Sequence, residues 1–433
     1  MALGLALVCL QQEQSLVRLL RVLTVAGSFI VAALLTQVDS EDRDHLLLPA
    51  VSLIAGIGVV FLWRLNPEFA SRQIIWMLMG SALMILVYYL VDDVRDLGRY
   101  KYTAGIGAVL LMVATMIWGQ EKGGARLWLN IADIVSFQPG ELAKILMCLF
   151  LAGYVADKGD LIRSQSRDSD LLASAALRHM GPLLLVVAFS LAVFVLLRDL
   201  GAAMLFFGLF VAVSYLASGR KRYAVVMLVL FAAGTVAAYY SFPHVSRRMQ
   251  AWLIPDADPY GTGHQILQVL FGLAAGGIGG VGFGKGFPDS LPAAETDAIL
   301  AVIAEEVGLL GAVGLMLLFL FVAYRTFAIA WQSKDRFGAL LAANLGIVFA
   351  LQTLVIAGGL LRLIPLTGIT LPFVSYGGSS VVVNFIALGL VLTVSRDCRP
   401  AIGRRAVPRA TDNDARERLP ERFVAGNGAA PSR

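Results

Sequence analysis

Long apolar runs separated by short polar stretches dominate this sequence. Because a bilayer core about 30 Å thick requires about 20 apolar residues per helix, each run of this length predicts a membrane-spanning helix. The runs cover residues 17–38, 46–63, 73–91, 103–119, 140–156, 180–197, 200–217, 223–241, 298–324, 338–361 and 377–395. Only Arg198 and Asp199 separate the sixth run from the seventh. The pattern therefore predicts an all-α polytopic membrane protein with about 10 to 11 transmembrane helices.

Composition narrows the class of protein. Of the 433 residues, 58% are hydrophobic and 15% charged, whereas a soluble domain is about 25% charged. This excludes a soluble enzyme and leaves a transporter, channel, receptor or membrane-embedded enzyme. The three cysteines and four histidines show neither CxxC nor HExxH spacing, so we expect no disulfide framework and no zinc site. We expect no nucleic-acid partner.

The distribution of basic residues predicts the orientation in the membrane, because Lys and Arg are enriched in short cytoplasmic loops. One alternating set of connections holds Arg95, Arg99, Lys101, Lys158, Arg163, Arg167, Arg178, Arg220, Lys221, Arg222, Arg325, Lys334 and Arg336. We expect these on the cytoplasmic side and the stretches 120–139, 242–297 and 362–376 outside. The acidic stretch 39–44 departs from this rule.

Three regions follow from these patterns. Residues 1–16 form an N-terminal segment that lacks the basic start and small-residue cleavage site of a signal peptide. Residues 17–396 form the transmembrane domain. Residues 397–433 carry eight Arg against five acidic residues and few apolar ones, so we expect a disordered, cytoplasmic tail.

The extracytoplasmic loop 242–297 is too long for a simple connector. Its segment HQILQVLFGLAAGGIGG is apolar enough to lie on or re-enter the membrane, and GGIGGVGFGKG follows. Amides of these glycines beside Lys285 are one way to hold phosphate oxygens. The alternative is that the glycines only permit tight turns and close packing.

The same loop ends at Thr296 and Asp297, just before a long apolar run. One interpretation is a helix N-cap followed by an acid that suits the helix dipole. The other is a carboxylate at the outer mouth of a helix that accepts a proton from a substrate hydroxyl. The residues alone leave both interpretations open.

Ionisable residues inside apolar runs are costly and often functional. Glu141 and Lys144 are three residues apart in QPGELAKIL, a spacing that allows an ion pair on one helical face. The pair is either structural or lines a polar cavity. Further polar positions are Glu305 and Glu306, two turns into a predicted helix, and the Arg198–Asp199 break.

Five motifs, in order along residues 124–380, resemble the signature segments of the SEDS family, which includes RodA, FtsW and SpoVE. They are GARLWLNIADIVSFQPGELAKI, LRDLGAAML, RMQAWLIPDADPYGTGHQILQ, GFGKG…LPAAETDAILAVIAEEVGLLG and IPLTGITLPFVSYGGSS. Two departures are Glu295, where the family commonly has His, and His264 where it commonly has Tyr. The last motif favours a RodA-like member.

The resemblance implies a bacterial cytoplasmic-membrane enzyme that polymerises lipid II into glycan strands on the outer face of the membrane, for cell elongation, shape or division. Its expected partner is a class B penicillin-binding protein. The family's essential carboxylate falls on Asp297, its Glu–Lys pair on Glu141 and Lys144, and its loop arginine on Arg126.

The mechanism we expect is an inverting transfer in which Asp297 accepts the proton of the acceptor hydroxyl. Stabilisation of the leaving pyrophosphate is expected from Arg126, Lys285, Arg248 or a divalent cation, Mg²⁺ or Mn²⁺, whose ligands the sequence does not identify. Glu141, Lys144, Glu305, Glu306 and Asp199 are expected to be structural or to line a polar cavity. The alternatives are a lipid II flippase, or a non-catalytic scaffold of a synthase complex.

Overall fold

The computed structural model describes residues 27, 44–122, 125–131, 135–165, 175–396 and 398. The N-terminal segment 1–16 lies outside the described residues. So do all of the apolar run 17–38 except Gly27 and all of the tail 397–433 except Cys398. The predictions for these regions therefore remain predictions.

A long helix is present at each of the ten apolar runs from residue 46 onward. These helices are α3 (Leu47–Leu65), α4 (Pro67–Leu90), α6 (Lys101–Trp118), α7 (Pro139–Gln165), α8 (Ala175–Leu196), α9 (Leu200–Ser218), α10 (Lys221–Ser241), α13 (Ile299–Gln332), α14 (Arg336–Leu360) and α15 (Gly378–Arg396). Within the described chain, eight of them are long and apolar enough to cross a membrane. The predicted helical membrane class is confirmed.

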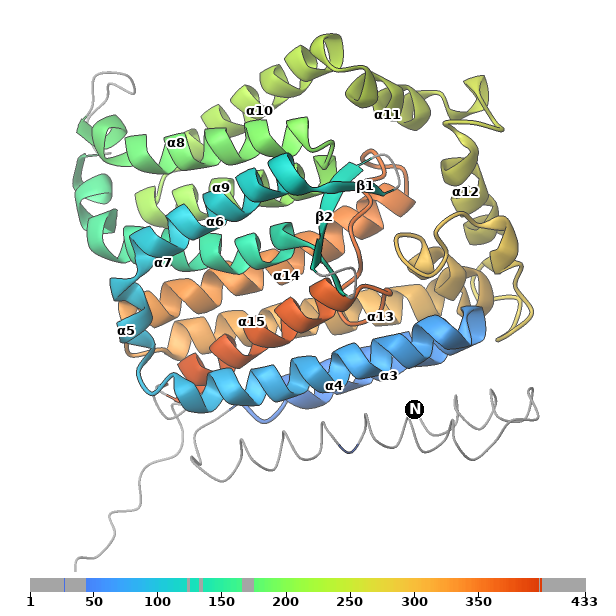
Figure 1. Ribbon diagram of the computed structural model, residues 1–433, viewed down its shortest axis with the longest axis horizontal. Helices are drawn as coiled ribbons and strands as arrows, with labels where there is room; N and C mark the ends of the chain where they lie inside the picture. The colour runs from blue at the N-terminus through green and yellow to red at the C-terminus, as the bar shows by residue number, and fades with distance from the viewer. Residues whose placement is uncertain are drawn as a thin grey trace, which may run out of the picture. The chain divides into compact units, whose positions relative to one another are not determined.

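The helices run side by side in one bundle (Figure 1). α15 packs against α4, α14 against α13 and α6 against α7. Gly80 of α4 permits one of these close approaches, because a Cβ there would lie 2.5 Å from the ring of Phe385 on α15. Smaller elements lie between the long helices: α5 (Val94–Arg99), α11 (Pro243–Leu253), α12 (His264–Gly276) and the 3₁₀ turns η1 (Pro255–Ala257) and η2 (Pro288–Ser290).

The polar stretch after α6 forms a small antiparallel sheet, in the order β1 (Gln120–Lys122), β2 (Ala125–Ile131) and β3 (Val135–Phe137). The side chain of Asn130 links the three strands: its amide donates to Gln120 at 2.6 Å, and its carbonyl oxygen accepts from Ser136 at 2.7 Å. The backbone amide of Gln138 donates to Ser379 Oγ at 3.1 Å. The sheet is thereby fixed to the start of α15.

The two ends of the bundle differ in chemistry. We call the end that carries the sheet, α11, α12 and the loop 361–377 the loop end, and the opposite end the basic end. Ion pairs between helices join the basic end: Lys101 with Asp157, Arg336 with Asp160, and Arg95 with Asp335. These connections are the ones whose basic residues predicted a cytoplasmic side.

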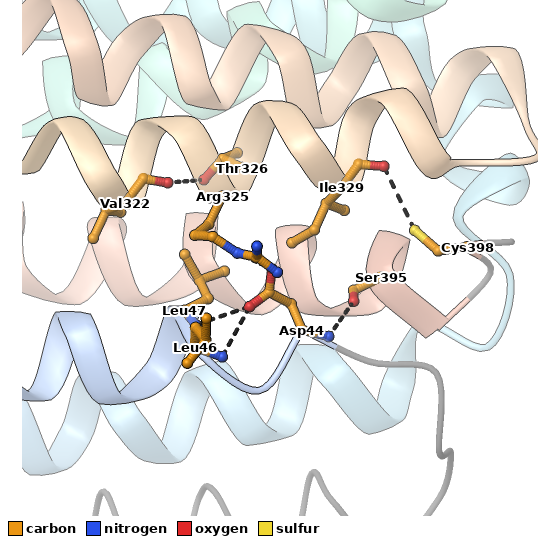
Figure 2. A network of polar contacts seen from close by, with 9 residues as sticks. All are labelled: Asp44, Leu46, Leu47, Val322, Arg325, Thr326, Ile329, Ser395 and Cys398. Atoms are coloured by element: carbon orange, nitrogen blue, oxygen red, sulfur yellow. Dashed lines mark hydrogen bonds and ion pairs between the residues drawn. The ribbon is translucent and has the colours of Figure 1, made fainter. Parts of the chain in front are cut away.

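A further network at the basic end joins three segments that are distant in sequence (Figure 2). Arg325 of α13 contacts Asp44 Oδ2 through Nη2 at 2.6 Å and Nε at 2.7 Å. The other oxygen of Asp44 accepts from the amides of Leu46 and Leu47, and the Asp44 amide donates to Ser395 of α15 at 3.2 Å. This network fixes the start of α3 against α13 and α15.

Candidate functional site

Asp297 lies in the turn that precedes α13, at the loop end. The N-cap of α13 is Ala298, and no side chain caps this helix terminus. The interpretation of Thr296 and Asp297 as capping residues is therefore wrong. Burial raises the pKa of Asp297, which the Thr296 hydroxyl and the charge of Arg248 partly lower again. A raised pKa suits a group that accepts a proton near neutral pH.

The loop 371–377 holds the turn before Asp297 in place. Ser375 Oγ donates to the Thr296 carbonyl at 2.6 Å, and the Tyr376 amide donates to the Glu295 carbonyl at 2.8 Å. Buried Gln73 of α4 supports this loop, because its Nε2 donates to the Ser375 carbonyl at 2.9 Å. The SYGG motif thus connects a membrane-spanning helix to the turn that carries Asp297.

Several residues of the loop end adopt backbone conformations that L-residues rarely occupy. Gly368 has a φ of 72°, and a Cβ on this residue would lie 3.5 Å from Asp297 Oδ2. Non-glycine residues with positive φ, in the part of the chain that the structure describes, are Arg198, Ala293, Arg362 and Phe373. All four lie in loops at this end. Such strain costs about 1–3 kcal/mol per residue and tends to gather at functional sites.

Arg248 of α11 interacts electrostatically with Asp297 and with a second carboxyl group, that of Asp199. Its charge lowers the pKa of both groups. Asp199 N-caps α9 by accepting from the Ala202 amide at 2.8 Å. Burial nevertheless raises the pKa of Asp199 to about 6. The buried Nη1 of Arg248 has no hydrogen-bond partner among the described residues, so this guanidinium group has a donor available for an anion.

Reciprocal hydrogen bonds hold α11, and with it Arg248, against the loop 361–377. Trp252 Nε1 donates to the Arg362 carbonyl at 3.0 Å, while Arg362 Nε donates to the Trp252 carbonyl at 2.8 Å. Arg362 also donates to the Leu253 carbonyl at 2.6 Å. These contacts give a local reason for the positive φ of Arg362.

The predicted pair of Glu141 and Lys144 is present in the first turns of α7, with 2.8 Å between Lys144 Nζ and Glu141 Oε2. Both side chains are buried, at 10% exposure for Glu141 and 7% for Lys144. Their charges act on Asp199 in opposite directions, since Glu141 raises its pKa and Lys144 lowers it. The pair and Asp199 therefore belong to one polar group.

Arg126 is exposed on β2, where its Nε lies 3.9 Å from Glu121 Oε2. Glu121 also contacts Arg198, at 3.3 Å. The charges of Arg198 and Arg248 contribute, after burial, to lowering the pKa of His244. Arg198 and Arg248 therefore lie close enough to His244 to interact with it, and the sequence alone identified neither His244 nor Arg198 as a candidate site residue. The only signals were the polar break at 198–199 and the proximity of His244 to Arg248 along one amphipathic helix.

In the glycine loop, defined as residues 277–287, several backbone amides already donate hydrogen bonds to the start of α13. The amides of Val281 and Gly282 donate to the carbonyls of Glu305 and Glu306, and those of Gly284 and Phe287 to their carboxylates. The structure therefore does not support a phosphate-binding nest at these amides. Lys285 itself is exposed.

An apolar cavity of about 540 Å³ lies between α8, α9, α10 and α11. Among the described residues that line it, only Thr235 and Thr367 carry a hydroxyl group, and the other lining side chains are almost entirely aliphatic, aromatic or Met. Three lining residues, Leu200, Met249 and Thr367, are direct chain neighbours of Asp199, Arg248 and Gly368. The lining of the cavity therefore extends to residues next to these polar positions, an arrangement suited to a ligand with an apolar chain and a polar, anionic head.

Divalent-cation binding was expected from the chemistry of a pyrophosphate leaving group. Within the described ranges, no three His, Cys, Asp or Glu side chains come together in a way that could hold an ion. The expected divalent cation therefore remains a prediction.

Together these features define a polytopic membrane protein in which a half-buried carboxylate and an arginine lie near an apolar cavity between helices. The chain belongs to the FtsW/RodA/SpoVE family, described as "Cell cycle protein", whose model matches residues 44–399. The expected family is confirmed.

Relatives and solved structures agree with this assignment. The "Peptidoglycan glycosyltransferase RodA" of Mycobacterium tuberculosis is 40% identical over 375 residues, which cover 84% of this chain and 80% of the relative. The "Probable peptidoglycan glycosyltransferase FtsW" of Thiomicrospira cyclica is 36% identical over 337 residues, 77% of this chain and 83% of the relative.

Two solved structures are similar in fold. One belongs to work titled "Structural coordination of polymerization and crosslinking by a peptidoglycan synthase complex", with a TM-score of 0.68, 29% identity, and coverage of 83% of this chain and 99% of that one. The Rod shape determining protein RodA of Thermus thermophilus has a TM-score of 0.60 and 26% identity, and covers 83% of this chain and 98% of its own.

Proposed function

We propose that this protein is a peptidoglycan glycosyltransferase that joins lipid II molecules into glycan strands. The observation that carries the proposal is an apolar cavity whose lining residues Met249 and Thr367 are chain neighbours of Arg248 and of Gly368, the glycine beside Asp297. Lipid II combines a long apolar chain with a pyrophosphate and a disaccharide, so it matches both parts of this arrangement. The names of the relatives, RodA and FtsW glycosyltransferases, support the same activity.

The reaction we infer is an inverting transfer. The acceptor sugar's 4-hydroxyl loses its proton to the Asp297 carboxylate while its oxygen bonds to the anomeric carbon of the donor. The bond from that carbon to the pyrophosphate oxygen breaks, and undecaprenyl pyrophosphate leaves with the bonding electrons. The free donor of Arg248 is suited to stabilise this leaving charge, with Arg126 and Lys285 as further candidates.

We further propose that the loop end faces outward and the basic end, with the tail, faces the cytoplasm. The basic connections between the helices support this orientation. A class B penicillin-binding protein is the partner we propose. We also propose a divalent cation, Mg²⁺ or Mn²⁺, as a stabiliser of the leaving pyrophosphate, with ligands still to be identified.

Polymerisation of labelled lipid II by the purified full-length protein, alone and with its penicillin-binding protein, tests this proposal. Wild type should form glycan strands, and Asp297→Asn, which keeps the size of the side chain but cannot accept the proton, should form none. A scaffold would show no dependence on Asp297. A flippase would move lipid II across a vesicle membrane without making strands. Equal strand formation by both proteins would refute the role of Asp297.

A further inference from the structure

The helix that follows Asp297 is broken near its start. Gly308 in α13 has φ 83° and ψ 179°, so α13 consists of a short helix, Ile299–Val307, and a long one that begins at Leu309. This backbone conformation is accessible essentially only to glycine. In an unbroken helix, the amides of Leu309 and Leu310 would donate to the carbonyls of Glu305 and Glu306.

The glycine loop fills this break. The Leu309 amide donates instead to the Gly277 carbonyl at 2.9 Å, and the Leu310 amide to the Ile278 carbonyl at 3.3 Å. In return, the carbonyls of Glu305 and Glu306 accept from Val281 and Gly282, each at 3.0 Å. The loop thus pairs with these four backbone groups, the amides of Leu309 and Leu310 and the carbonyls of Glu305 and Glu306.

The side chains of Glu305 and Glu306 also accept hydrogen bonds from the glycine loop, and we call this set of contacts the clamp. Glu306 Oε2 accepts from the Gly284 amide at 2.9 Å, and Glu305 Oε1 accepts from the Phe287 amide at 3.0 Å. Arg64, at the end of α3, lies 3.5 Å from Glu306 Oε1 and donates to the Gly284 carbonyl at 3.2 Å. Both glutamates are buried, at 7% and 1% exposure. Burial of two adjacent carboxylates is costly, so a role in the fold or function has to offset it.

The short helix links this clamp to Asp297. Every residue from Ile299 to Glu306 is buried, so the helix is packed on all sides and has little room to move independently. At 1.5 Å per residue, Glu306 lies about 10 Å along the axis from Ile299. Asp297 precedes the first turn of this helix, and the loop 371–377 holds its other side. A displacement of the clamped end would therefore be transmitted to Asp297.

We propose that Glu305 and Glu306 are positioning residues for Asp297. By locking the glycine loop into the break of α13, they fix the short helix that carries the carboxylate. This inference rests on the proposed function. These glutamates would thus affect the rate of catalysis rather than only line a polar cavity. Arg64 of α3 contributes to the same positioning through its contacts with Glu306 and Gly284.

Steady-state polymerisation by full-length Glu306→Gln and Glu305→Gln proteins tests the proposal. Each substitution keeps an oxygen that can accept the loop amide but removes the charge. We expect kcat to fall at least tenfold, KM for lipid II to change less than twofold, and the acidic midpoint of the pH–rate profile to move. Asp289→Asn, an exposed acid in the adjacent turn η2, is the matched control and should behave as wild type.

A double variant, Glu306→Gln with Arg64→Met, should lower kcat no further than Glu306→Gln alone, because the two residues act as one unit. Wild-type kcat and pH midpoint in both folded Gln variants would overturn the proposal. Loss of folded protein in both, measured by size-exclusion profile and thermal unfolding, would also overturn it, because the glutamates would then be folding residues. Failure of the proposed function looks different: wild type makes no glycan, or Asp297→Asn is as active as wild type.

Discussion

The ion pair of Glu141 and Lys144 offers a sharp test, because the same two residues are either a structural pair or part of the substrate site. The perturbation is a set of three variants: Glu141→Leu, Lys144→Met, and the two combined. Each single change leaves one charge buried at about the depth recorded for the pair, 7–10% exposure. The double change replaces both charges by apolar side chains of similar volume.

The expected magnitudes follow from burial. Removing one partner of a buried ion pair costs about 3–5 kcal/mol, because the remaining charge has lost its counter-ion. Replacing both partners by apolar residues is often neutral, or stabilising by about 1–4 kcal/mol. The double variant should thus be more stable than either single variant by several kcal/mol in unfolding free energy, although it carries more changes. The charges of Glu141 and Lys144 shift the pKa of Asp199 in opposite directions, so removing both should disturb Asp199 less than removing one.

Thermal unfolding of the purified proteins in detergent measures the stabilities. The exposed pair of Glu68 and Arg72, with side chains 69% and 56% exposed, is the control, and its removal should cost only about 0.3–0.5 kcal/mol. A double variant as unstable as the single ones would refute the reasoning. Lipid II polymerisation then decides the role: a stable, active double variant means a structural pair, and a stable, inactive one means a pair that serves the substrate.

Three further predictions concern other charges. Arg248→Gln should move the acidic midpoint of the pH–rate profile upward, because Arg248 lowers the pKa of Asp297; Arg248→Lys, which keeps the charge, should shift it less. Asp199 has a folded-state pKa raised from 3.8 to about 6, so the folded state keeps a proton that the unfolded state releases. Stability should therefore fall as pH rises from about 4 to 6, and Asp199→Asn should abolish this fall in thermal unfolding. Arg325→Met should destabilise the protein by about 3–5 kcal/mol, because it leaves the Asp44 side chain, 3% exposed, without its counter-ion (Figure 2). Combining it with Asp44→Asn should recover much of that loss, and no recovery would contradict a buried pair.

The membrane-spanning helices could be predicted from the sequence because their signal is local. A run of about 20 apolar residues must satisfy its backbone internally wherever it lies in the bilayer, and the helix is the way for a single segment to do so. Even the weakest boundary, at Arg198 and Asp199, is a real break, with Arg198 at φ 63° and Asp199 capping α9. The pairing of Glu141 and Lys144 was equally local, since it depends on a three-residue spacing in one helix.

The surroundings of Asp297 could not be predicted, because they depend on contacts between distant segments. Gln73 supports Ser375 across 302 residues, and Ser375 holds Thr296 across 79. No periodicity encodes such pairs. The capping interpretation failed for the same reason: the carbonyls of Glu295 and Thr296 accept hydrogen bonds from the loop 371–377, so the turn has a geometry that the local sequence does not specify.

The two ends of the bundle suggest how stability and activity are divided in this protein. At the basic end, ion pairs join helices through side chains, and each described non-glycine residue there has an ordinary φ. At the loop end, four non-glycine residues have positive φ, and burial raises the pKa of the Asp199 and Asp297 carboxyl groups. Strain and buried charge both cost stability, so the rest of the bundle has to offset them. Substitutions that relieve this cost at the loop end, such as Asp199→Asn, should therefore stabilise the fold near neutral pH, whereas removing one partner of the Arg325–Asp44 pair at the basic end should lower stability.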